Sequence, residues 1–406
     1  MIYIVLCSLL VSSLPALLSN GLSSKSSNSL YIILVICLVC VAGFRSGSTL
    51  PDYATYAGYY SNVVAGQLSY FIEISFVLLA KLSNIILADN SIVLFVIYAI
   101  IGVSLKTYAI KKLTPLFFLS LLIYISNYFI LHEMIQIRAG VATAFILLSI
   151  VPLYDRSIKN FVLLIGLAAL FHYSSIIFLL LWFLKTKRFN RMLFVSLLPL
   201  SYLLHFIINS GDFISLISSY IPFVDIVEKL TTYSQGPDAF KINLFGLFPL
   251  TRIIILLFFI GFVHNIQRQN KYFYILLKMY ALGICSYIAL SSYPVIGVRI
   301  GYTLLATEIV IIPTLVYIIK GYYYPRLLVI FYAFLAFSLN VFFTSYFKYY
   351  GEERNLMADD SIYNEVGAIH SLANKMSEPL NLIELQSGTY KGKDDIERLD
   401  DLYVRA

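Results

Sequence analysis

Only a few ionisable side chains interrupt the long apolar runs of this 406-residue sequence, and they are its candidates for chemistry. A charged group within such a run is costly in a membrane, so its presence suggests a function. A guanidinium binds phosphate through paired N–H groups, whereas a carboxylate or an imidazole can transfer a proton. The main candidates are Arg45, Asp52, Glu73, Glu133, Arg138, His172, Arg299 and Glu308.

Three of the candidates are arginines at a polar break or at the edge of an apolar run: Arg45, Arg138 and Arg299. Guanidinium groups keep their charge when partly desolvated, so three that converge would suit a diphosphate. The alternative is structural, because an arginine can also extend to the membrane surface or pair with a carboxylate. Glu308 follows Arg299 by about two and a half helical turns, on roughly the opposite face, so we expect no direct pair between them.

Proton transfer has three candidates. Asp52 follows Pro51 and could act as a general base on a hydroxyl, or it could cap the helix predicted for the Tyr-rich stretch after it. His172 lies within an apolar run, where a lone histidine is more often a hydrogen-bonded core residue than a catalyst. Glu73 lies near the start of the third run. The sequence does not choose among them.

No motif points to a metal, a nucleotide or a disulfide. The cysteines lie in apolar runs, and no other potential metal ligand has the spacing of a metal site with them. We interpret all four as small core residues: Cys7, Cys37, Cys40 and Cys285. The sequence has no phosphate-binding loop and no dinucleotide fingerprint. We therefore expect no cofactor, no metal and no nucleic-acid partner, and a soluble nucleotide-using enzyme is disfavoured.

The elements that carry the candidate residues are predicted to be membrane helices. The chain is 60% hydrophobic and 13% charged, whereas soluble domains are about 45–50% apolar and about 25% charged. Its apolar runs are about 17–25 residues long, enough to cross a bilayer, and they do not alternate as barrel strands do. Because lipid cannot satisfy backbone polar groups, these runs must be helical. The predicted fold is an all-α polytopic integral membrane protein.

About 12 transmembrane segments are expected, with a possible broken or re-entrant helix near His172. The segments lie at about 1–19, 30–44, 70–87, 91–110, 115–131, 139–153, 161–184, 192–208, 244–263, 272–290, 300–319 and 327–347. Four basic side chains within these runs lie near enough to an end to extend to the surface, namely Lys106, His205, Arg252 and Lys278. The transmembrane domain would cover residues 1–350, with a larger external loop at about 209–242, and residues 351–406 would form a charged tail.

The distribution of charge orients only the second half of the chain. The first 350 residues carry a net charge of +13 and the tail a net charge of −6. Basic loops at 185–191, 268–271 and 320–326 alternate as cytoplasmic loops should, which places 209–242 and 291–299 outside. In the first half, Lys25 favours an external 45–56 stretch, but strict alternation then places Lys111 and Lys112 outside, against the rule.

Several short motifs occur in order along the chain: Arg45 followed by Pro51-Asp52-Tyr53 and Tyr56, then Glu73, Ile137-Arg138-Ala139-Gly140-Val141-Ala142, Ala168-Ala169-Leu170-Phe171-His172-Tyr173-Ser174, and Arg299 followed by Tyr302. Together they resemble the EpsG family of bacterial polysaccharide polymerases, which is related in role to the Wzy-type O-antigen polymerases. The spacing from Gly47 to Asp52 is longer than the compact form of that family.

The resemblance implies a metal-independent glycosyltransferase of GT-C-like architecture in the bacterial inner membrane, with its active site facing the periplasm or exterior. Its substrate would be an oligosaccharide repeat unit on undecaprenyl diphosphate. It would transfer the growing glycan to the non-reducing end of another lipid-linked unit, in O-antigen (lipopolysaccharide), capsule or exopolysaccharide biosynthesis. The resemblance also implies contact with membrane lipids. A chain-length regulator and a flippase are possible protein partners.

Within that reaction, the residues divide into two sets. The substrate-binding set is Arg45, Arg138 and Arg299 on the phosphates with Tyr53 and Tyr56 lining the site. The set for proton transfer is Asp52, His172 and Glu73. Three rival functions stay open: an O-antigen ligase, a membrane acyltransferase with His172 as its base, and a flippase or transporter of the lipid-linked sugar. Transporters often contain internal topological repeats, and none is evident in the sequence.

Overall fold

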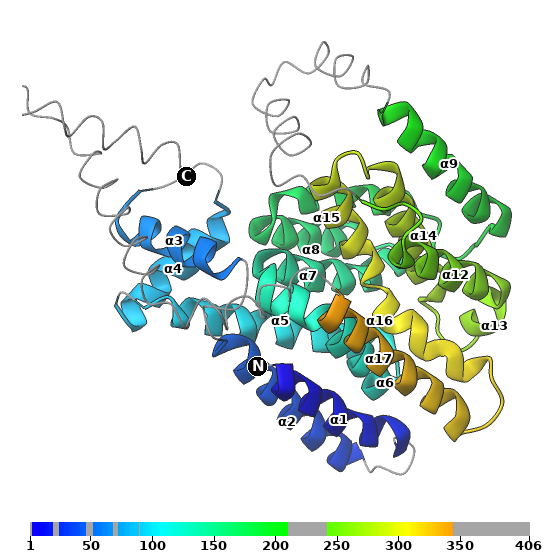
Figure 1. Cartoon of the computed structure of the whole chain (residues 1–406), viewed down its shortest axis with the longest axis horizontal. Coiled ribbons are helices and arrows are strands. Elements are labelled where there is room, and N and C mark those ends of the chain that lie inside the picture. Colours follow the sequence, from blue (N-terminus) through cyan, green and yellow to red (C-terminus); the bar gives the residue numbers. More distant parts are fainter. Residues whose placement is uncertain are drawn as a thin grey trace, which may run out of the picture. The chain divides into compact units, whose positions relative to one another are not determined.

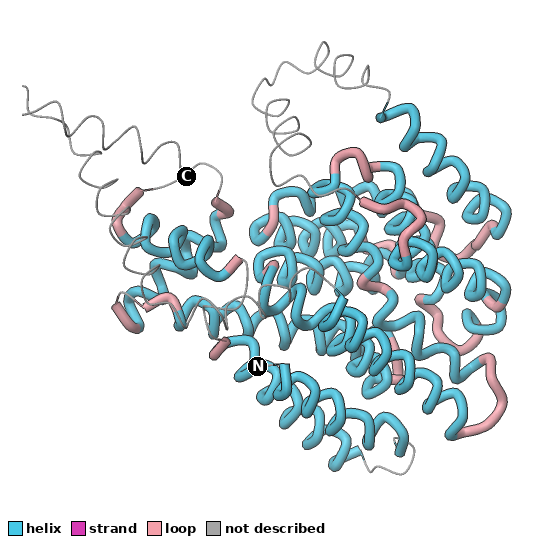
Figure 2. The backbone as a smooth tube through the Cα atoms, viewed as in Figure 1, coloured by secondary structure: helices cyan, strands magenta, loops and turns pink. Residues whose placement is uncertain are grey.

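The computed structural model describes residues 2–18, 24–45, 52–67, 72–88, 90–209 and 242–343. All of them belong to one unit, Met1–Tyr346. Within these ranges the chain consists of helices and connecting loops, with no strand (Figure 2). The predicted external loop at 209–242 and the charged tail at 351–406 lie, apart from the loop's two end residues, outside the described residues.

The α-helices are labelled in Figure 1, where the colours follow the sequence. The first half contains α1 (Ile2–Leu18), α2 (Ser24–Gly43), α3 (Tyr53–Val64), α4 (Ile74–Ile86), α5 (Ile92–Leu113), α6 (Phe117–Tyr124), the π-helix η3 (Ile125–Ile135) and α7 (Ile137–Tyr154). The second half contains α8 (Ile158–Phe171), the 3-10 helix η4 (Tyr173–Phe183), α9 (Arg191–Asn209), α12 (Leu247–Gly261), α13 (Val263–Gln267), α14 (Phe273–Ala289), α15 (Pro294–Leu305), α16 (Glu308–Ile311), the 3-10 helix η5 (Ile312–Tyr317) and α17 (Tyr323–Phe343).

The prediction of an all-α polytopic membrane protein is confirmed. In the described part of the chain, seven helical stretches are long and apolar enough to cross a membrane: Lys25–Gly43, Ile92–Leu113, Phe117–Ile135, Ile137–Tyr154, Arg191–Asn209, Pro294–Tyr317 and Tyr323–Val341. Shorter apolar helices of 10–17 residues accompany them. The count of about 12 spans and the GT-C-like architecture stay predictions.

The centre of the bundle is built from the stretch 117–135 and the helices around it. The apolar window of Phe117–Ile135 is 89% buried, against 22% for that of Lys25–Gly43, so the former lies inside the protein while the latter presents most of its surface outward. Helix α5 packs against both α2 and α7, and α7 packs along α8 (Figure 1). Of the candidate residues, Glu133 and Arg138 lie on these central helices, and His172 directly follows α8.

The polar residues expected to end the fifth segment lie inside a helix instead. The π-helix η3 continues to Ile135, and His132 and Glu133 within it are buried at 2% exposure each. Their partner is Lys106 of α5, whose Nζ lies 3.0 Å from Glu133 Oε1 and 3.0 Å from His132 Nδ1. The expectation that Lys106 extends to the surface is therefore wrong: a buried carboxylate holds its charge inside.

Other sequence expectations also need correction. The possible helix in the Tyr-rich stretch after Asp52 is present and forms α3. The expectation that all four cysteines are core residues is wrong, because three of them have exposed side chains: Cys7, Cys37 and Cys40. The run expected at 300–319 begins earlier, at Pro294, and its helix is interrupted at Ala306 and Thr307.

The break predicted near His172 is confirmed. Helix α8 ends at Phe171, and His172 has an extended backbone with φ −153° and ψ 105°. The chain then continues as the 3-10 helix η4, which packs back against α8. The two elements form a hairpin with His172 at one end.

Two glycines test the close packing of η3 on α7. A Cβ on Gly140 would lie 2.0 Å from the backbone oxygen of His132, whereas a Cβ on Gly166 in α8 meets nothing within 4 Å. We expect Gly140→Ala to lower the free energy of unfolding by about 1–3 kcal/mol or more, since the backbone at His132 must move. Gly166→Ala should raise it by about 0.5–1 kcal/mol by restricting the unfolded chain. Thermal unfolding in detergent measures both, and equal stability of the two variants would contradict the packing described.

Candidate functional site

Glu73 is the centre of the candidate site. It immediately precedes α4 and is 4% exposed. Its carboxylate accepts a hydrogen bond from Nη1 of Arg138, at the start of α7. Its other oxygen lies 3.2 Å from Nδ1 of His172, at the break between α8 and η4. Three segments that are far apart in the sequence therefore meet at one carboxylate.

Local structure fixes the position of His172. Because α8 stops at Phe171, the extended backbone of His172 directs the chain away from the helix axis. The next residue, Tyr173, donates its hydroxyl to the backbone oxygen of Ile72 at 3.2 Å, which ties the break to the segment before Glu73. The Phe171 ring packs edge-on against Tyr98 of α5, with centroids 6.0 Å apart. The residues on either side of His172 are thus fixed in place.

Aromatic rings surround the Arg138 guanidinium. Its Cζ lies 5.3 Å from the ring centroid of Tyr56 and 5.7 Å from that of Tyr59, both in α3, and 6.0 Å from that of Phe76 in α4. The negative faces of such rings stabilise a cation. Arg138 therefore stays charged with one N–H group committed to Glu73, and its side chain remains 19% exposed.

Asp52 lies at the N-cap position of α3, but its side chain makes no capping hydrogen bond. This observation removes the main support for the capping alternative. Burial raises the pKa of Asp52 above its usual value, and the charges of Arg138 and Arg299 oppose that rise. Burial also acts on Glu73, but the His172 hydrogen bond and the Arg138 charge outweigh it and hold the pKa of Glu73 below its usual value. Of the two carboxylates, Asp52 is the better proton acceptor.

The other predicted residues lie around this group rather than within it. Arg45 is 5% exposed, and its Nη1 donates to the backbone oxygens of Ala42 at 2.9 Å and Glu133 at 3.3 Å. Its guanidinium covers Phe95 at 4.2 Å, and Tyr53 packs on the same ring at 4.5 Å between centroids. Arg299, on α15, is exposed. The structure thus brings together Glu73, Arg138, His172 and Tyr56. Asp52 is close enough for the charge of Arg138 to act on it. The roles assigned to these residues stay predictions.

The arrangement can perform acid–base chemistry. An imidazole that donates Nδ1–H to a carboxylate presents Nε2 as a proton acceptor. Nε2 of His172 has no hydrogen-bond partner among the described residues. Within the same ranges, no three His, Cys, Asp or Glu side chains gather closely enough to hold a metal ion.

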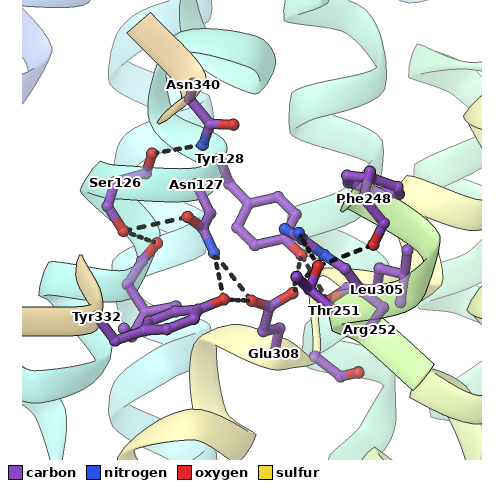
Figure 3. Close-up of polar contacts among 12 residues, drawn as sticks. Ser126, Asn127, Tyr128, Phe248, Thr251, Arg252, Leu305, Glu308, Tyr332 and Asn340 are labelled. Carbon is purple, nitrogen blue, oxygen red and sulfur yellow. Dashed lines mark hydrogen bonds and ion pairs between the residues drawn. The ribbon is translucent and has the colours of Figure 1, made fainter. Parts of the chain in front are cut away.

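The candidate residue Glu308 belongs to a second polar group, whose other members the sequence did not indicate, and its cation is Arg252 rather than Arg299. Glu308 is fully buried and bonds to Asn127 Nδ2 at 3.0 Å, Tyr128 Oη at 3.3 Å and Tyr332 Oη (Figure 3). Arg252 of α12 lies 3.6 Å from its carboxylate, measured from Nε to Oε2. The expectation that Arg252 extends to the surface is therefore wrong. The sequence signal for this pair was that Arg252 and Glu308 are ionisable residues in two separate apolar runs.

Most of the chain is similar to known proteins. The sequence model of the EpsG family matches residues 28–356. The amylovoran biosynthesis protein AmsC of Erwinia amylovora is 27% identical over 340 residues, which are 79% of this chain and 85% of that protein. No solved structure matches.

The end of the chain is similar to a different group of proteins. The mannose-6-phosphate isomerase C-terminal family matches residues 341–401. The alginate biosynthesis protein AlgA of Pseudomonas aeruginosa is 50% identical over 50 residues, 12% of this chain and 10% of that protein. The mannose-1-phosphate guanylyltransferase ManC of Salmonella typhimurium is 46% identical over 55 residues, 14% of this chain and 12% of that protein. The chain thus spans about a tenth of these relatives, and the sequence analysis interpreted this segment only as a charged tail.

The lowered pKa of Glu73 predicts a pH dependence of stability. The stabilisation by its ionised form is fully present above its unfolded pKa of about 4.5 and is lost as the pH falls through the lower folded value. We expect the melting temperature of the wild type to fall between pH 5 and pH 2 by more than that of Glu73→Gln, because this range covers the unfolded pKa and the lower folded one. Asp155→Asn, which removes an exposed carboxylate, is the matched control. Identical pH curves for wild type and Glu73→Gln would contradict the arrangement.

The pair of Arg252 and Glu308 predicts a double-mutant result. Arg252→Met leaves a buried carboxylate without its cation and should cost about 3–5 kcal/mol of stability. Adding Glu308→Gln removes that charge while an amide can still bond to the neighbouring polar groups, so the double variant should recover much of the loss. Unfolding in detergent measures both, with exposed Lys159→Met as the control. Additive losses would show that the two side chains do not interact.

Proposed function

Because this chain belongs to the EpsG family, we propose that it is a membrane glycosyltransferase that polymerises lipid-linked repeat units in polysaccharide biosynthesis. The similarity to AmsC, a protein named for amylovoran biosynthesis, supports the pathway. The observation that carries the proposal is the Glu73 carboxylate shared by Arg138 and His172. It unites a cation suited to phosphate with an imidazole suited to proton transfer.

The reaction joins an acceptor hydroxyl to the anomeric carbon of the donor glycan. His172 Nε2 accepts the proton of the hydroxyl as its oxygen attacks that carbon. The bond from the anomeric carbon to the undecaprenyl diphosphate oxygen breaks, and the leaving diphosphate keeps the electron pair. Arg138, whose Nε has no hydrogen-bond partner among the described residues, and the exposed Arg299 offset the negative charge that develops on it.

Glu73 and Asp52 have different roles in this scheme. Glu73 is the positioning residue, since it orients the imidazole and stabilises the imidazolium that forms, as the carboxylate of a catalytic triad does. Asp52 is the second candidate base, because burial raises its pKa toward the working range. Tyr53 and Tyr56 are proposed to line the sugar site. Arg45, held against η3, is proposed to bind phosphate through Nε and Nη2, which have no partner among the described residues.

The site is proposed to face the outside of a bacterial inner membrane. The basic segment 185–191 lies at the end of the α8–η4 hairpin away from His172, and basic loops are cytoplasmic. His172 and its partners then lie toward the opposite leaflet. Repeat units that reach that leaflet on their lipid carrier, supplied by a flippase and limited by a chain-length regulator, are the proposed substrates.

A length-resolved assay tests the proposal. Full-length protein in detergent is mixed with lipid-linked repeat units, and the products are separated by size. We expect a ladder from the wild type. His172→Gln should lower the rate by about 10²–10⁴-fold, as loss of a general base does. His264→Gln, at an exposed histidine of α13, is the matched control and should keep the ladder.

Further variants separate the roles and the rival functions. Glu73→Gln should lower the rate with little change in KM, whereas Arg299→Gln should weaken binding of the diphosphate. If His172→Gln left the ladder unaffected and Asp52→Asn abolished it, Asp52 rather than His172 would be the general base. Absence of any ladder with competent substrate would favour transport, transfer to a different acceptor would favour a ligase, and dependence on an acyl donor would favour an acyltransferase.

A further inference from the structure

A basic pocket lies at the opposite end of the α8–η4 hairpin from His172. It has a volume of about 800 Å³ and is lined by residues from the end of η4, the following loop, the start of α9 and one residue of α14. Its lining includes four basic side chains and no acidic one, namely Lys185, Arg188, Arg191 and Lys278. Helix α8 has 14 residues, so the hairpin separates the pocket from His172 by about 20 Å.

The buried Lys278 builds the wall of this pocket. It is 3% exposed, and its Nζ donates to the backbone oxygens of both Lys185 and Arg188. Arg156 supports the same loop by donating to the backbone oxygen of Trp182 at 2.6 Å and to that of Leu184. The loop is therefore held in place by two cations that are already bonded.

The remaining cations have no such partner. Lys185, Arg188 and Arg191 are exposed. The described residues form no ion pair between any of them and a carboxylate. Three positive charges thus surround one hollow without a paired carboxylate. This arrangement favours the binding of an anion with several oxygens.

Apolar side chains border the same hollow. Phe183 is 80% exposed and Met192 is 81% exposed, and both line the pocket. A ligand that satisfied the whole pocket would combine an anionic group with hydrocarbon. Since the loop at 185–191 is predicted to be cytoplasmic, the available amphiphiles are the lipids of that leaflet, which carries anionic headgroups.

We propose that this pocket binds the phosphate headgroup of an anionic phospholipid, with Lys185, Arg188 and Arg191 around the phosphate and an acyl chain along Phe183 and Met192. This site is separate from the proposed catalytic site and does not depend on the proposed reaction. It fixes the cytoplasmic end of the hairpin whose other end carries His172.

The chain supplies its own reporter. Trp182 is its single tryptophan and directly precedes Phe183. Full-length protein is reconstituted in phosphatidylcholine vesicles that contain a minor fraction of lipid with brominated acyl chains, which quench tryptophan at short range. We expect brominated phosphatidylglycerol to quench Trp182 more strongly than brominated phosphatidylcholine at the same fraction.

Two matched variants separate a site from general attraction. Arg188→Gln should weaken the apparent affinity for phosphatidylglycerol about fivefold, the worth of one basic residue at an anionic surface. Lys187→Gln, which removes the neighbouring cation outside the pocket lining, should leave it unchanged. Quenching by brominated phosphatidylcholine reports folding and should be the same in all three proteins.

Three outcomes would overturn the proposal. Equal quenching by the two lipids would show no preference for an anionic headgroup. An equal loss in Lys187→Gln and Arg188→Gln would show attraction by the whole loop rather than by the pocket. Abolition of the excess quenching by added inorganic phosphate would show that the pocket is a site for a soluble phosphate.

Discussion

A charge that is buried in a membrane protein must be paired or hydrogen-bonded, and this constraint fixes the contacts between the helices that carry such charges. An unpaired ionised group in a low-dielectric interior is costly, whereas a paired one is tolerated and holds its two elements together. Each carboxylate buried in the described helices has a cation beside it, in the pairs Glu73 with Arg138, Glu133 with Lys106 and Glu308 with Arg252. These pairs connect α4 to α7, α5 to η3 and α12 to α16, so the bundle is fixed at three internal points.

The irregular helical segments coincide with these points. The π-helix η3 carries Glu133 of one pair as well as Asn127 and Tyr128, which bond to Glu308 of another. The 3-10 helix η4 begins directly after His172, and the interruption between α15 and α16 directly precedes Glu308. A regular helix spaces side chains at fixed angles, so a change of helix type changes which residues face the interior. The departures from α geometry therefore place the polar groups against their partners.

The α8–η4 hairpin joins two chemically different ends. One end carries His172, bonded to a carboxylate and close to a guanidinium, and the other carries a loop whose free side chains are cationic. Hydrogen bonds hold both ends, through Tyr173 to Ile72 at one and through Lys278 and Arg156 at the other. A hairpin fixed at both ends would keep the proposed acid–base group at a constant depth, as the proposed reaction between two lipid-linked molecules requires.

The sequence alone determined the class of the protein and the candidates for its site. Apolar runs of membrane length predicted helices, and scarce ionisable residues within them identified Glu73, Arg138 and His172. Which of these meet was decided by the tertiary structure, because Glu73 lies 65 positions from Arg138 and 99 from His172. Periodicity relates residues along one helix but says nothing about the register between helices. For the same reason Lys106 and Arg252 were expected at the membrane surface: only packing brings a buried carboxylate to each of them, and that pairing keeps their charges inside.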